Sequence, residues 1–410
     1  MKFGKQLTHL GLYLSFSLSG AALSFGAVLI LTRVLPTEEY GAIGIFFSIL
    51  YLVAPAVSLA ADGLVSVNKS RLDPKQYLEF QRTYVTIAFA SFLVFQTGFV
   101  LAWLAKLYTM PLLAFVPAYA LIRFLSAMAA AESVIDEKPW LYGLIAVLTP
   151  ASALAMTAML VFTLGGYAVY RILATFLAEA LVVFFRYRTH LIHFVALRFD
   201  RATARQIFRF GLPSLVALTG GWALNESDKI IIAREAGLDV AGIYTAAASL
   251  AAIMMTLNQS VTNALYPEMF RRLKTGQQLR QVIIRYVASF VGISSLLCLA
   301  VISAYLLVRD IVLPERYADT KPFFIALALA GVAVSFYRPF GLAAEYFQLA
   351  RTRAIAILLG GATTLLVSTV GVRHGNALWA PAGIAAGYLM AAFVVASGLK
   401  MREKNHSNTQ

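Results

Sequence analysis

The sequence has few charged residues and only one cysteine. Charged side chains make up 13% of its 410 residues, about half of the roughly 25% that is usual in soluble domains. Cys298 stands alone in an apolar run, so no intrachain disulfide can form and thiol chemistry is not expected. Hydrophobic residues, by contrast, reach 60%. This balance excludes an ordinary soluble protein and indicates an integral membrane protein.

The short alternating segments of a membrane β-barrel are also missing. Several apolar runs instead reach about 20 residues, the length with which a helix crosses a hydrocarbon layer of about 30 Å. The first run, residues 9–33, is longer than a signal-peptide core and is followed at once by further apolar runs, so we interpret it as a retained helix. We therefore predict an all-α polytopic membrane protein.

Hydropathy and turn residues predict twelve transmembrane helices in two six-helix lobes. Their predicted ranges are 9–33, 41–66, 83–107, 111–132, 140–163, 166–186, 208–233, 240–265, 282–308, 322–346, 354–373 and 377–399. The net charge of +14 could suggest a nucleic-acid partner, but the basic residues lie in short loops. Most of them fall on the side of the two termini. The positive-inside rule therefore predicts that both termini are cytoplasmic, and we expect no nucleic-acid partner.

The predicted domains are an N-terminal lobe at 1–186, a basic cytoplasmic linker at 187–207, a C-terminal lobe at 208–400 and a polar tail at 401–410. The linker is expected to lie on anionic lipid headgroups. The lobes also look repeated, because "RVLPTEEYG" after the first helix aligns with "REAGLDVAG" after the seventh. Two lobes of the same orientation correspond to parallel repeats, and in such transporters the substrate usually lies between the repeats.

Long stretches of the sequence resemble a known family. "LTRVLPTEEYGAIGIFFSILYLVAPAVSLAADGL" in the first lobe and "GLPSLVALTGGWALNESDKIIIAREAGLDVAGIYTAAASL", "NALYPEMFRR" and "EYFQLARTRAIAILLGG" in the second resemble the Wzx-type polysaccharide biosynthesis proteins. These are oligosaccharide flippases that share a fold with the multidrug and toxic compound extrusion (MATE) transporters. The resemblance implies a V-shaped, MATE-like bundle. It also implies an undecaprenyl-diphosphate-linked oligosaccharide, such as an O-antigen repeat unit, as cargo.

Such a cargo needs cations for its phosphates along the membrane. The predicted helices contain four, which are the candidate substrate-binding residues Arg123, Arg338, Arg171 and Lys229. Helix counting places Arg123 near the midplane, Arg171 and Lys229 in the outer third and Arg338 towards the cytoplasm. Arg123 and Arg338 lie at nearly equivalent positions of the two lobes, so we predict that Ala at either site abolishes surface polysaccharide.

The alternative is that these cations pair with buried carboxylates and only fix helix packing. Glu179 is eight residues from Arg171, and Glu226 is three residues before Lys229, so both pairs could form along one helix. For Arg123 and Arg338 no local partner is evident. We retain both interpretations for the four residues.

Carboxylates within the predicted helices raise the question of ion coupling. The candidates for coupling or gating are Glu179, Asp228, Glu226 and Asp62, since a carboxyl group in a low dielectric can bind a proton or a sodium ion. Asp62 lies beside Gly63 and could equally be a helix-end residue. The polar stretch "NESDK" at 225–229 is predicted to be an outer vestibule or gate. No cofactor and no metal site are predicted.

The resemblance therefore predicts a non-enzymatic flippase or antiporter of the bacterial inner membrane, with a role in lipopolysaccharide or related polysaccharide biosynthesis. Polymerase and chain-length components of such an assembly system are the expected partners. A multidrug exporter of the same fold is the first alternative, although four buried cations suit a cationic drug poorly. A polytopic polymerase or ligase is the second, and the large periplasmic loop expected of one is missing from the sequence.

Overall fold

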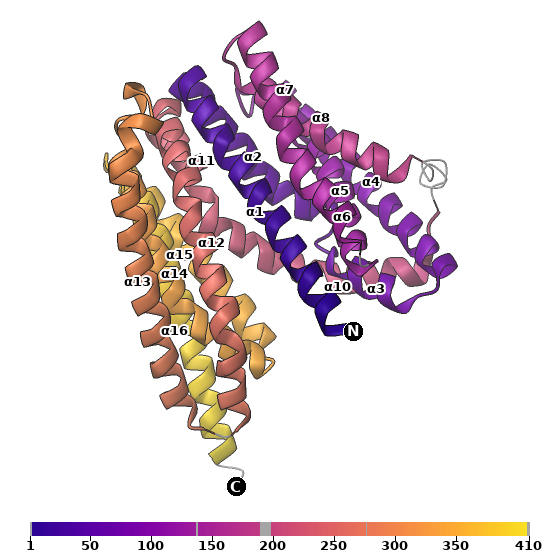
Figure 1. The fold of residues 1–410 in the computed structure, drawn as a ribbon, viewed down its shortest axis with the longest axis vertical. Coiled ribbons are helices and arrows are strands. Elements are labelled where there is room, and N and C mark those ends of the chain that lie inside the picture. The colour runs from indigo at the N-terminus through magenta and orange to yellow at the C-terminus, as the bar shows by residue number, and fades with distance from the viewer. Residues whose placement is uncertain (1, 137, 189–197, 276, 408–410) are drawn as a thin grey trace. The chain divides into compact units, whose positions relative to one another are not determined.

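The computed structural model describes residues 2–136, 138–188, 198–275 and 277–407, and every regular element in them is helical. Within these described ranges, eleven helices are long and apolar enough to cross a membrane. The helix α1 (Lys2–Val34) precedes them and ends in an apolar stretch, Ala22–Val34. The prediction of an all-α polytopic membrane protein is therefore confirmed, with a number of spans close to the twelve expected (Figure 1).

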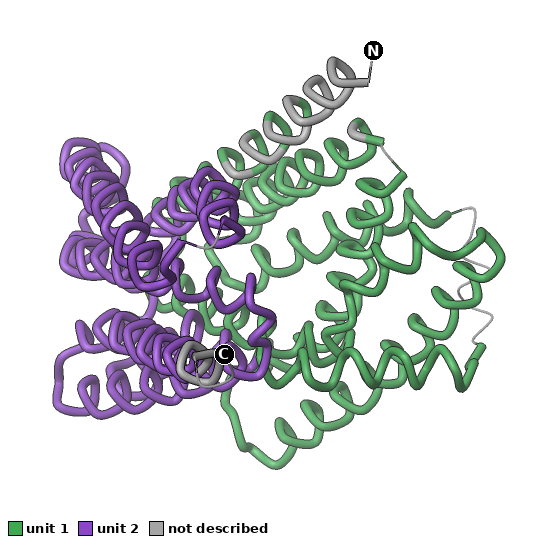
Figure 2. The backbone as a smooth tube through the Cα atoms, turned by 90° about the horizontal axis from the view of Figure 1, so that it is seen from below, with its two compact units in different colours: residues 1–218 green, residues 219–410 purple. Residues whose placement is uncertain are grey.

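The chain divides into two compact units, residues 1–218 and 219–410 (Figure 2). Unit 1 contains α1, α2 (Thr37–Val57), α3 (Gly63–Arg71), α4 (Pro74–Leu104), η1 (Pro111–Phe115), α5 (Val116–Ile135), α6 (Pro139–Gly143), η2 (Leu144–Leu148), α7 (Thr149–Leu164) and α8 (Ala168–Tyr187). The helix α10 (Arg201–Asn225) begins in unit 1 and ends in unit 2. Unit 2 continues with α11 (Ser227–Glu235), α12 (Leu238–Lys274), α13 (Leu279–Val312), η3 (Glu315–Tyr317), α14 (Thr320–Tyr346), α15 (Ala350–Arg373) and α16 (Trp379–Ser407).

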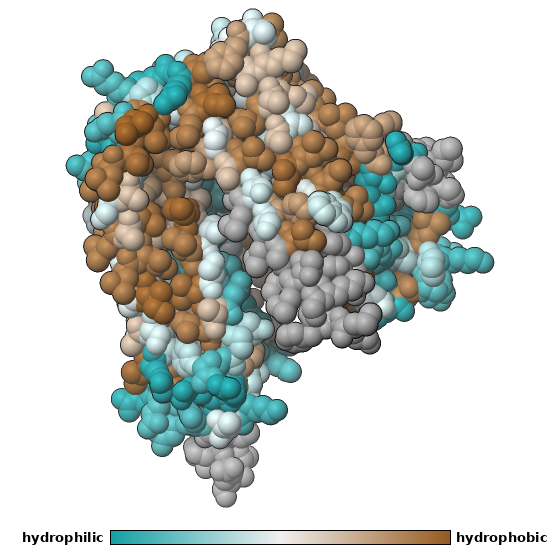
Figure 3. Space-filling model, in the orientation of Figure 1, coloured by the Kyte–Doolittle hydropathy of each residue, from teal (hydrophilic) through white to brown (hydrophobic). Residues whose placement is uncertain are grey.

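The surface of unit 2 has the polarity of a membrane-spanning bundle. Hydrophobic residues cover the middle of the visible face, and hydrophilic residues gather towards its two ends (Figure 3). On α13, for example, Leu296, Leu299 and Leu307 are at least 63% exposed, whereas Arg280 and Arg309 lie near the helix ends. Large exposed aliphatic side chains are expected where lipid, not water, is the solvent.

Several helices extend beyond the predicted apolar ranges, because hydropathy detects only their lipid-facing part. α4 begins at Pro74 and not at 83, since the Asp73 carboxylate accepts hydrogen bonds from the N–H groups of Lys75 and Gln76 and caps the helix. α10 begins at residue 201 and therefore includes the end of the predicted linker 187–207, whose residues 189–197 lie outside the described part. α16 runs to residue 407, through most of the predicted polar tail.

The predicted second helix, 41–66, is interrupted. α2 ends at Val57, and the turn that follows includes Leu59 and Ala60, each with a φ of 50°. The Ala60 N–H donates to the Pro55 carbonyl at 2.7 Å, which closes the end of the helix. Asp62 falls in this turn, immediately before α3, as expected for a helix-end residue.

Close backbone contact holds α15 against α16. A methyl group on Gly360 would lie 2.7 Å from the Gly387 carbonyl oxygen, so only glycine fits there. The Thr364 hydroxyl donates to the Gly383 carbonyl at 3.1 Å across the same interface. Small residues of this kind let membrane helices approach closely. Gly383 and Gly387 therefore pack helices, as their spacing indicates.

Candidate functional site

In unit 1 the candidate residues of α5 and α8 meet. Arg123 on α5 forms an ion pair with Glu179 on α8, with 3.0 Å between Nη1 and Oε1. Tyr119, one turn before Arg123, donates its hydroxyl to the same oxygen at 3.4 Å. Residues four apart share a helix face, so α5 presents Tyr119 and Arg123 together to α8. Because Tyr119 is fully buried, it packs α5 against α8.

The two partners of this pair differ in their exposure. The Glu179 side chain is 8% exposed, whereas that of Arg123 is 37% exposed. The Arg123 guanidinium also lies over the ring of Tyr51, at 5.4 Å from its centroid. Oε2 of Glu179 is buried and has no hydrogen-bond partner among the described residues. Arg123 therefore combines a buried counterion with N–H donors that still reach an open surface.

Arg171 has no carboxylate partner in the described part of the chain. Its guanidinium donates to the Thr157 hydroxyl of α7 at 3.2 Å, and that hydroxyl in turn donates to the Ala153 carbonyl at 2.5 Å. The pairing with Glu179 considered from the sequence was wrong, because the α8 carboxylate binds Arg123 of a neighbouring helix instead. Arg171 thus lies at the contact between α7 and α8 with no described carboxylate paired to it.

In unit 2 the predicted continuous helix 208–233 is broken at Glu226. α10 ends at Asn225, Glu226 adopts φ −129° and ψ −17°, and α11 begins at Ser227. The Asn225 side chain donates to the Gly221 carbonyl at 2.8 Å and the Ser227 hydroxyl donates to the Ala223 carbonyl at 2.6 Å. Such bonds to the preceding turn compete with the helical ladder and bend helices. The sequence "NESDK" therefore forms a helix junction, not a facet of one straight helix.

The junction concentrates three charged side chains. Lys229 Nζ lies 2.7 Å from Glu226 Oε2 and 3.8 Å from Asp228 Oδ1. Asp228 is 2% exposed, and its other oxygen accepts a hydrogen bond from the Tyr244 hydroxyl of α12. The pairing of Lys229 with Glu226 that the sequence suggested is confirmed. With both acids ionised, the group has a net charge of −1.

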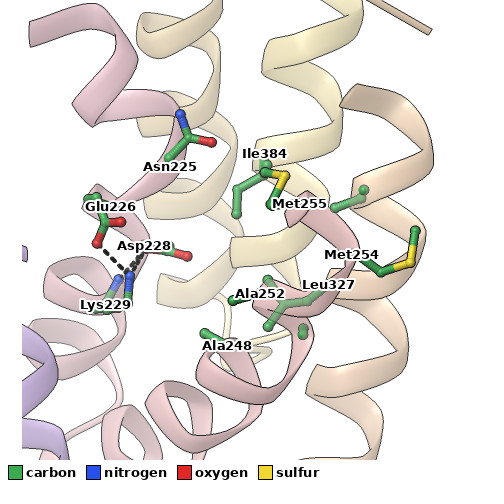
Figure 4. Close-up of a pocket in the computed structure, with 13 residues that line it drawn as sticks. Asn225, Glu226, Asp228, Lys229, Ala248, Ala252, Met254, Met255, Leu327 and Ile384 are labelled. Carbon is green, nitrogen blue, oxygen red and sulfur yellow. Dashed lines mark hydrogen bonds and ion pairs between the residues drawn. The ribbon is translucent and has the colours of Figure 1, made fainter. Parts of the chain in front are cut away.

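A cavity of about 220 Å³ adjoins this junction inside unit 2. Asn225, Glu226, Asp228 and Lys229 line one side, and Met254, Met255 and Leu327 belong to the opposite side, on α12 and α14 (Figure 4). Its size is below the roughly 300–1,000 Å³ of drug-sized ligand sites. The cavity can therefore hold a small polar group against an apolar wall.

Arg338 on α14 forms neither a hydrogen bond nor an ion pair with any other described residue. It lies close enough to Tyr337 and Tyr388 to interact electrostatically with both phenols. Tyr388 donates its hydroxyl to the Asn225 side-chain oxygen at 2.8 Å, and the rings of Tyr337 and Tyr388 are 5.9 Å apart. Tyr388 therefore connects the α10–α11 junction to the surroundings of Arg338 within unit 2.

Asp62 stands apart from these groups. Its carboxylate accepts hydrogen bonds from the Ser58 hydroxyl at 3.2 Å and the Tyr84 hydroxyl at 3.3 Å. Both bonds fix the turn between α2 and α3. No bond or ion pair within the described residues joins Asp62 to another candidate residue.

Sequence reasoning missed the tyrosines that organise the unit 2 group. Tyr244 binds Asp228, which lies 16 residues before it in the sequence. Tyr388 binds Asn225, which lies 163 residues before it. Their only signal is a phenol inside an apolar helix, where an O–H group needs a partner. That signal shows that a partner exists but not which residue it is.

A family model described as polysaccharide biosynthesis protein matches residues 30–322. The chain belongs to this polysaccharide biosynthesis family. The match covers more than half of the chain and includes Arg123, Glu179 and the α10–α11 junction, and it ends before Arg338. The family resemblance stated from the sequence is thereby confirmed. A search of curated proteins found no match.

Solved structures share the fold of this polysaccharide biosynthesis protein. A multidrug resistance MATE family transporter of the MOP superfamily, in an inward-facing conformation, matches 97% of this chain and 99% of its own, with TM-score 0.68 and 17% identity. The lipid II flippase MurJ, in an inward closed conformation, matches 96% and 87%, with TM-score 0.69 and 10% identity. A MOP superfamily transporter from Pyrococcus furiosus matches 96% and 94%, with TM-score 0.55 and 17% identity. These likenesses confirm the MATE-like fold.

Proposed function

We propose that the protein is a flippase that moves an undecaprenyl-diphosphate-linked oligosaccharide, such as an O-antigen repeat unit, across the bacterial inner membrane. Membership of a polysaccharide biosynthesis family supports a sugar cargo. A fold shared with MOP superfamily transporters, one of which is a lipid II flippase, supports movement across a membrane. A lipid-linked oligosaccharide is the cargo that satisfies both. The proposed mechanism is alternating access, with no covalent chemistry.

The observation that carries the proposal is an arginine in each unit that no described carboxylate neutralises. Among the described residues, Arg171 of unit 1 donates to the Thr157 hydroxyl and interacts electrostatically with the phenols of Tyr40 and Tyr119, and Arg338 of unit 2 lies beside two phenols. A lone cation within a membrane helix costs about 2.5–3.5 kcal/mol on insertion scales. An anionic cargo would offset this cost. A diphosphate is well suited, because guanidinium groups bind phosphate oxygens through two parallel hydrogen bonds.

Lys229 has a different role in this proposal. Glu226 and Asp228 surround it, so the junction does not attract a phosphate strongly. We assign the junction to gating, with the Lys229–Glu226 pair opening and closing beside the cavity. Glu179 is the proposed site for a coupling proton or sodium ion, because its second oxygen is buried and has no hydrogen-bond partner among the described residues. Asp62 is proposed only to fix a turn.

The orientation completes the proposal. With both termini cytoplasmic, as the distribution of basic residues predicts, transport would run from the cytoplasmic to the periplasmic leaflet. Polymerase and chain-length components that use the flipped unit would be the protein's partners.

The test compares Arg171→Ala and Arg338→Ala in cells that lack the native gene. Loss of a charge-assisted hydrogen bond is worth about 1.5–3 kcal/mol, so surface polysaccharide should fall by about 10- to 100-fold. Lysine at either site should restore part of the surface polysaccharide, because it restores the positive charge but cannot form the two parallel hydrogen bonds of a guanidinium group. Arg271→Ala is the matched control, since Arg271 is an exposed arginine at the end of α12. Normal polysaccharide in both alanine variants would sink the proposal.

A multidrug exporter is the second candidate, and the unit 2 cavity favours it. The cavity has two acids, one lysine and a methionine-lined wall, which would suit a small organic cation. Cells without the gene would then become more sensitive to cationic drugs while their polysaccharide stayed normal. If the protein is the proposed flippase, cells without the gene should lose surface polysaccharide while their sensitivity to cationic drugs stays unchanged.

A further inference from the structure

A pocket at the start of α10 gathers positive charge on one face of unit 1. The cavity measures about 490 Å³ and is lined by Leu64 of α3 and by Ala202, Arg205, Gln206, Arg209 and Phe210 of α10. Residues 202, 205, 206 and 209 lie at helical spacings of three and four, so they share one side of the helix. Arg205 and Arg209 therefore point to the same space.

Neither arginine is neutralised by a described residue. Arg205 and Arg209 are exposed, and the ion pairs of the described chain include neither of them. Asp200, the residue just before α10, does not line the pocket, and it caps the helix by accepting the Thr203 N–H at 2.7 Å. The pocket thus has two guanidinium groups and the Gln206 amide as donors for an anion.

The apolar part of α10 begins beside these arginines. Phe208 is 40% exposed, Phe210 44% and Leu212 50%, and the membrane-length apolar stretch of α10 runs on to Asn225. Exposed apolar side chains on such a helix face lipid tails, so the arginines stand at headgroup depth. Phe210 also reaches α3, where a methyl group on Gly63 would lie 3.4 Å from its ring.

We propose that this α3–α10 pocket binds the phosphate of an anionic membrane lipid. The two arginines and Gln206 would bind the phosphate oxygens, and Leu64 and Phe210 would contact the glycerol and the first acyl carbons. A free inorganic phosphate would use only the polar half of the pocket. A lipid phosphate matches both halves, and clustered basic residues beside a membrane helix typically recognise anionic headgroups. The site is independent of the proposed transport cycle.

The experiment counts lipids retained by the full-length protein in native mass spectrometry, with phosphatidylglycerol and phosphatidylcholine as probes. Each basic residue near an anionic surface is worth about five-fold in affinity, so Arg205→Gln with Arg209→Gln should weaken phosphatidylglycerol binding by about 30-fold. Arg280→Gln with Arg285→Gln is the matched control. These two arginines are exposed at the start of α13, with no ion pair among the described residues, and do not line the pocket.

A second variant leaves both arginines in place. Ala202→Glu adds a carboxylate at an exposed position of the pocket lining, so it should abolish the preference for phosphatidylglycerol without disturbing the fold. Equal losses in the α10 and α13 double variants, or unchanged binding in Ala202→Glu, would overturn the proposal. Binding of undecaprenyl phosphate with none of phosphatidylglycerol would also overturn it, because the pocket would then be a substrate site.

Discussion

The Arg123–Glu179 pair should respond unequally to the loss of each partner. In Arg123→Met, the carboxylate of Glu179 stays 8% exposed and keeps only the Tyr119 hydroxyl. In Glu179→Gln, the Arg123 guanidinium keeps its contact with the Tyr51 ring and stays partly exposed. Removing one partner of a fully buried pair costs about 3–5 kcal/mol. Because Arg123 is 37% exposed, solvent screens part of this interaction. We therefore expect the free energy of unfolding to fall by about 3 kcal/mol in Arg123→Met and by about 1 kcal/mol in Glu179→Gln.

The assay is unfolding of the purified full-length protein by SDS in a mild detergent, followed by circular dichroism. The double variant removes both charges of this pair, so it should be less destabilised than Arg123→Met alone. Arg271→Met is the control, since its pair with Glu268 is exposed and should contribute at most about 0.5 kcal/mol. Equal costs for the two single variants, or a double variant that costs their sum, would refute the reasoning.

Two further predictions concern the helix ends and the helix contacts. The bond from the Thr203 N–H lowers the pKa of Asp200, so its cap of α10 should be fully present above about pH 4 and lost as pH falls through the lower folded pKa. The protection of the first-turn amides of α10 against hydrogen exchange, relative to their intrinsic exchange rates, should therefore fall at acidic pH in the native chain but not in Asp200→Asn. Gly387→Ala should cost about 1–3 kcal/mol in SDS unfolding, because the added methyl would lie 2.6 Å from the Gly360 carbonyl oxygen. Gly292→Ala, where nothing lies within 4 Å, should be neutral or slightly stabilising, and an equal loss in both variants would contradict the packing argument.

The sequence predicted the membrane helices well, because about 20 consecutive apolar residues have few alternatives to a spanning helix. It placed helix ends poorly where polar residues extend a helix beyond the apolar layer. α4 and α10 both begin behind an aspartate cap, at Asp73 and Asp200, and hydropathy does not detect caps. The break at Glu226 was missed for a related reason, since it comes from side chains that bond to the preceding turn.

Partners along one helix could be predicted, and partners across helices could not. Lys229 and Glu226 are three residues apart, so their pairing follows from helical spacing. Arg123 and Glu179 are 56 residues apart, and their meeting depends on how α5 packs on α8. The same limit hid the bond between Asn225 and Tyr388.

This difference decides which cations suit an anionic cargo. By sequence alone, Arg171 and Lys229 have candidate carboxylate partners along their own helices, and Arg123 and Arg338 have none. In the structure Lys229 has two carboxylates within 4 Å, and Arg123 has one at 3.0 Å. A phosphate approaching Lys229 would meet a group of net charge −1, whereas at Arg171 or Arg338 it would meet an uncompensated guanidinium. Because like charges repel strongly where water is scarce, we assign the proposed phosphate contacts to the two arginines and the proposed gate to Lys229.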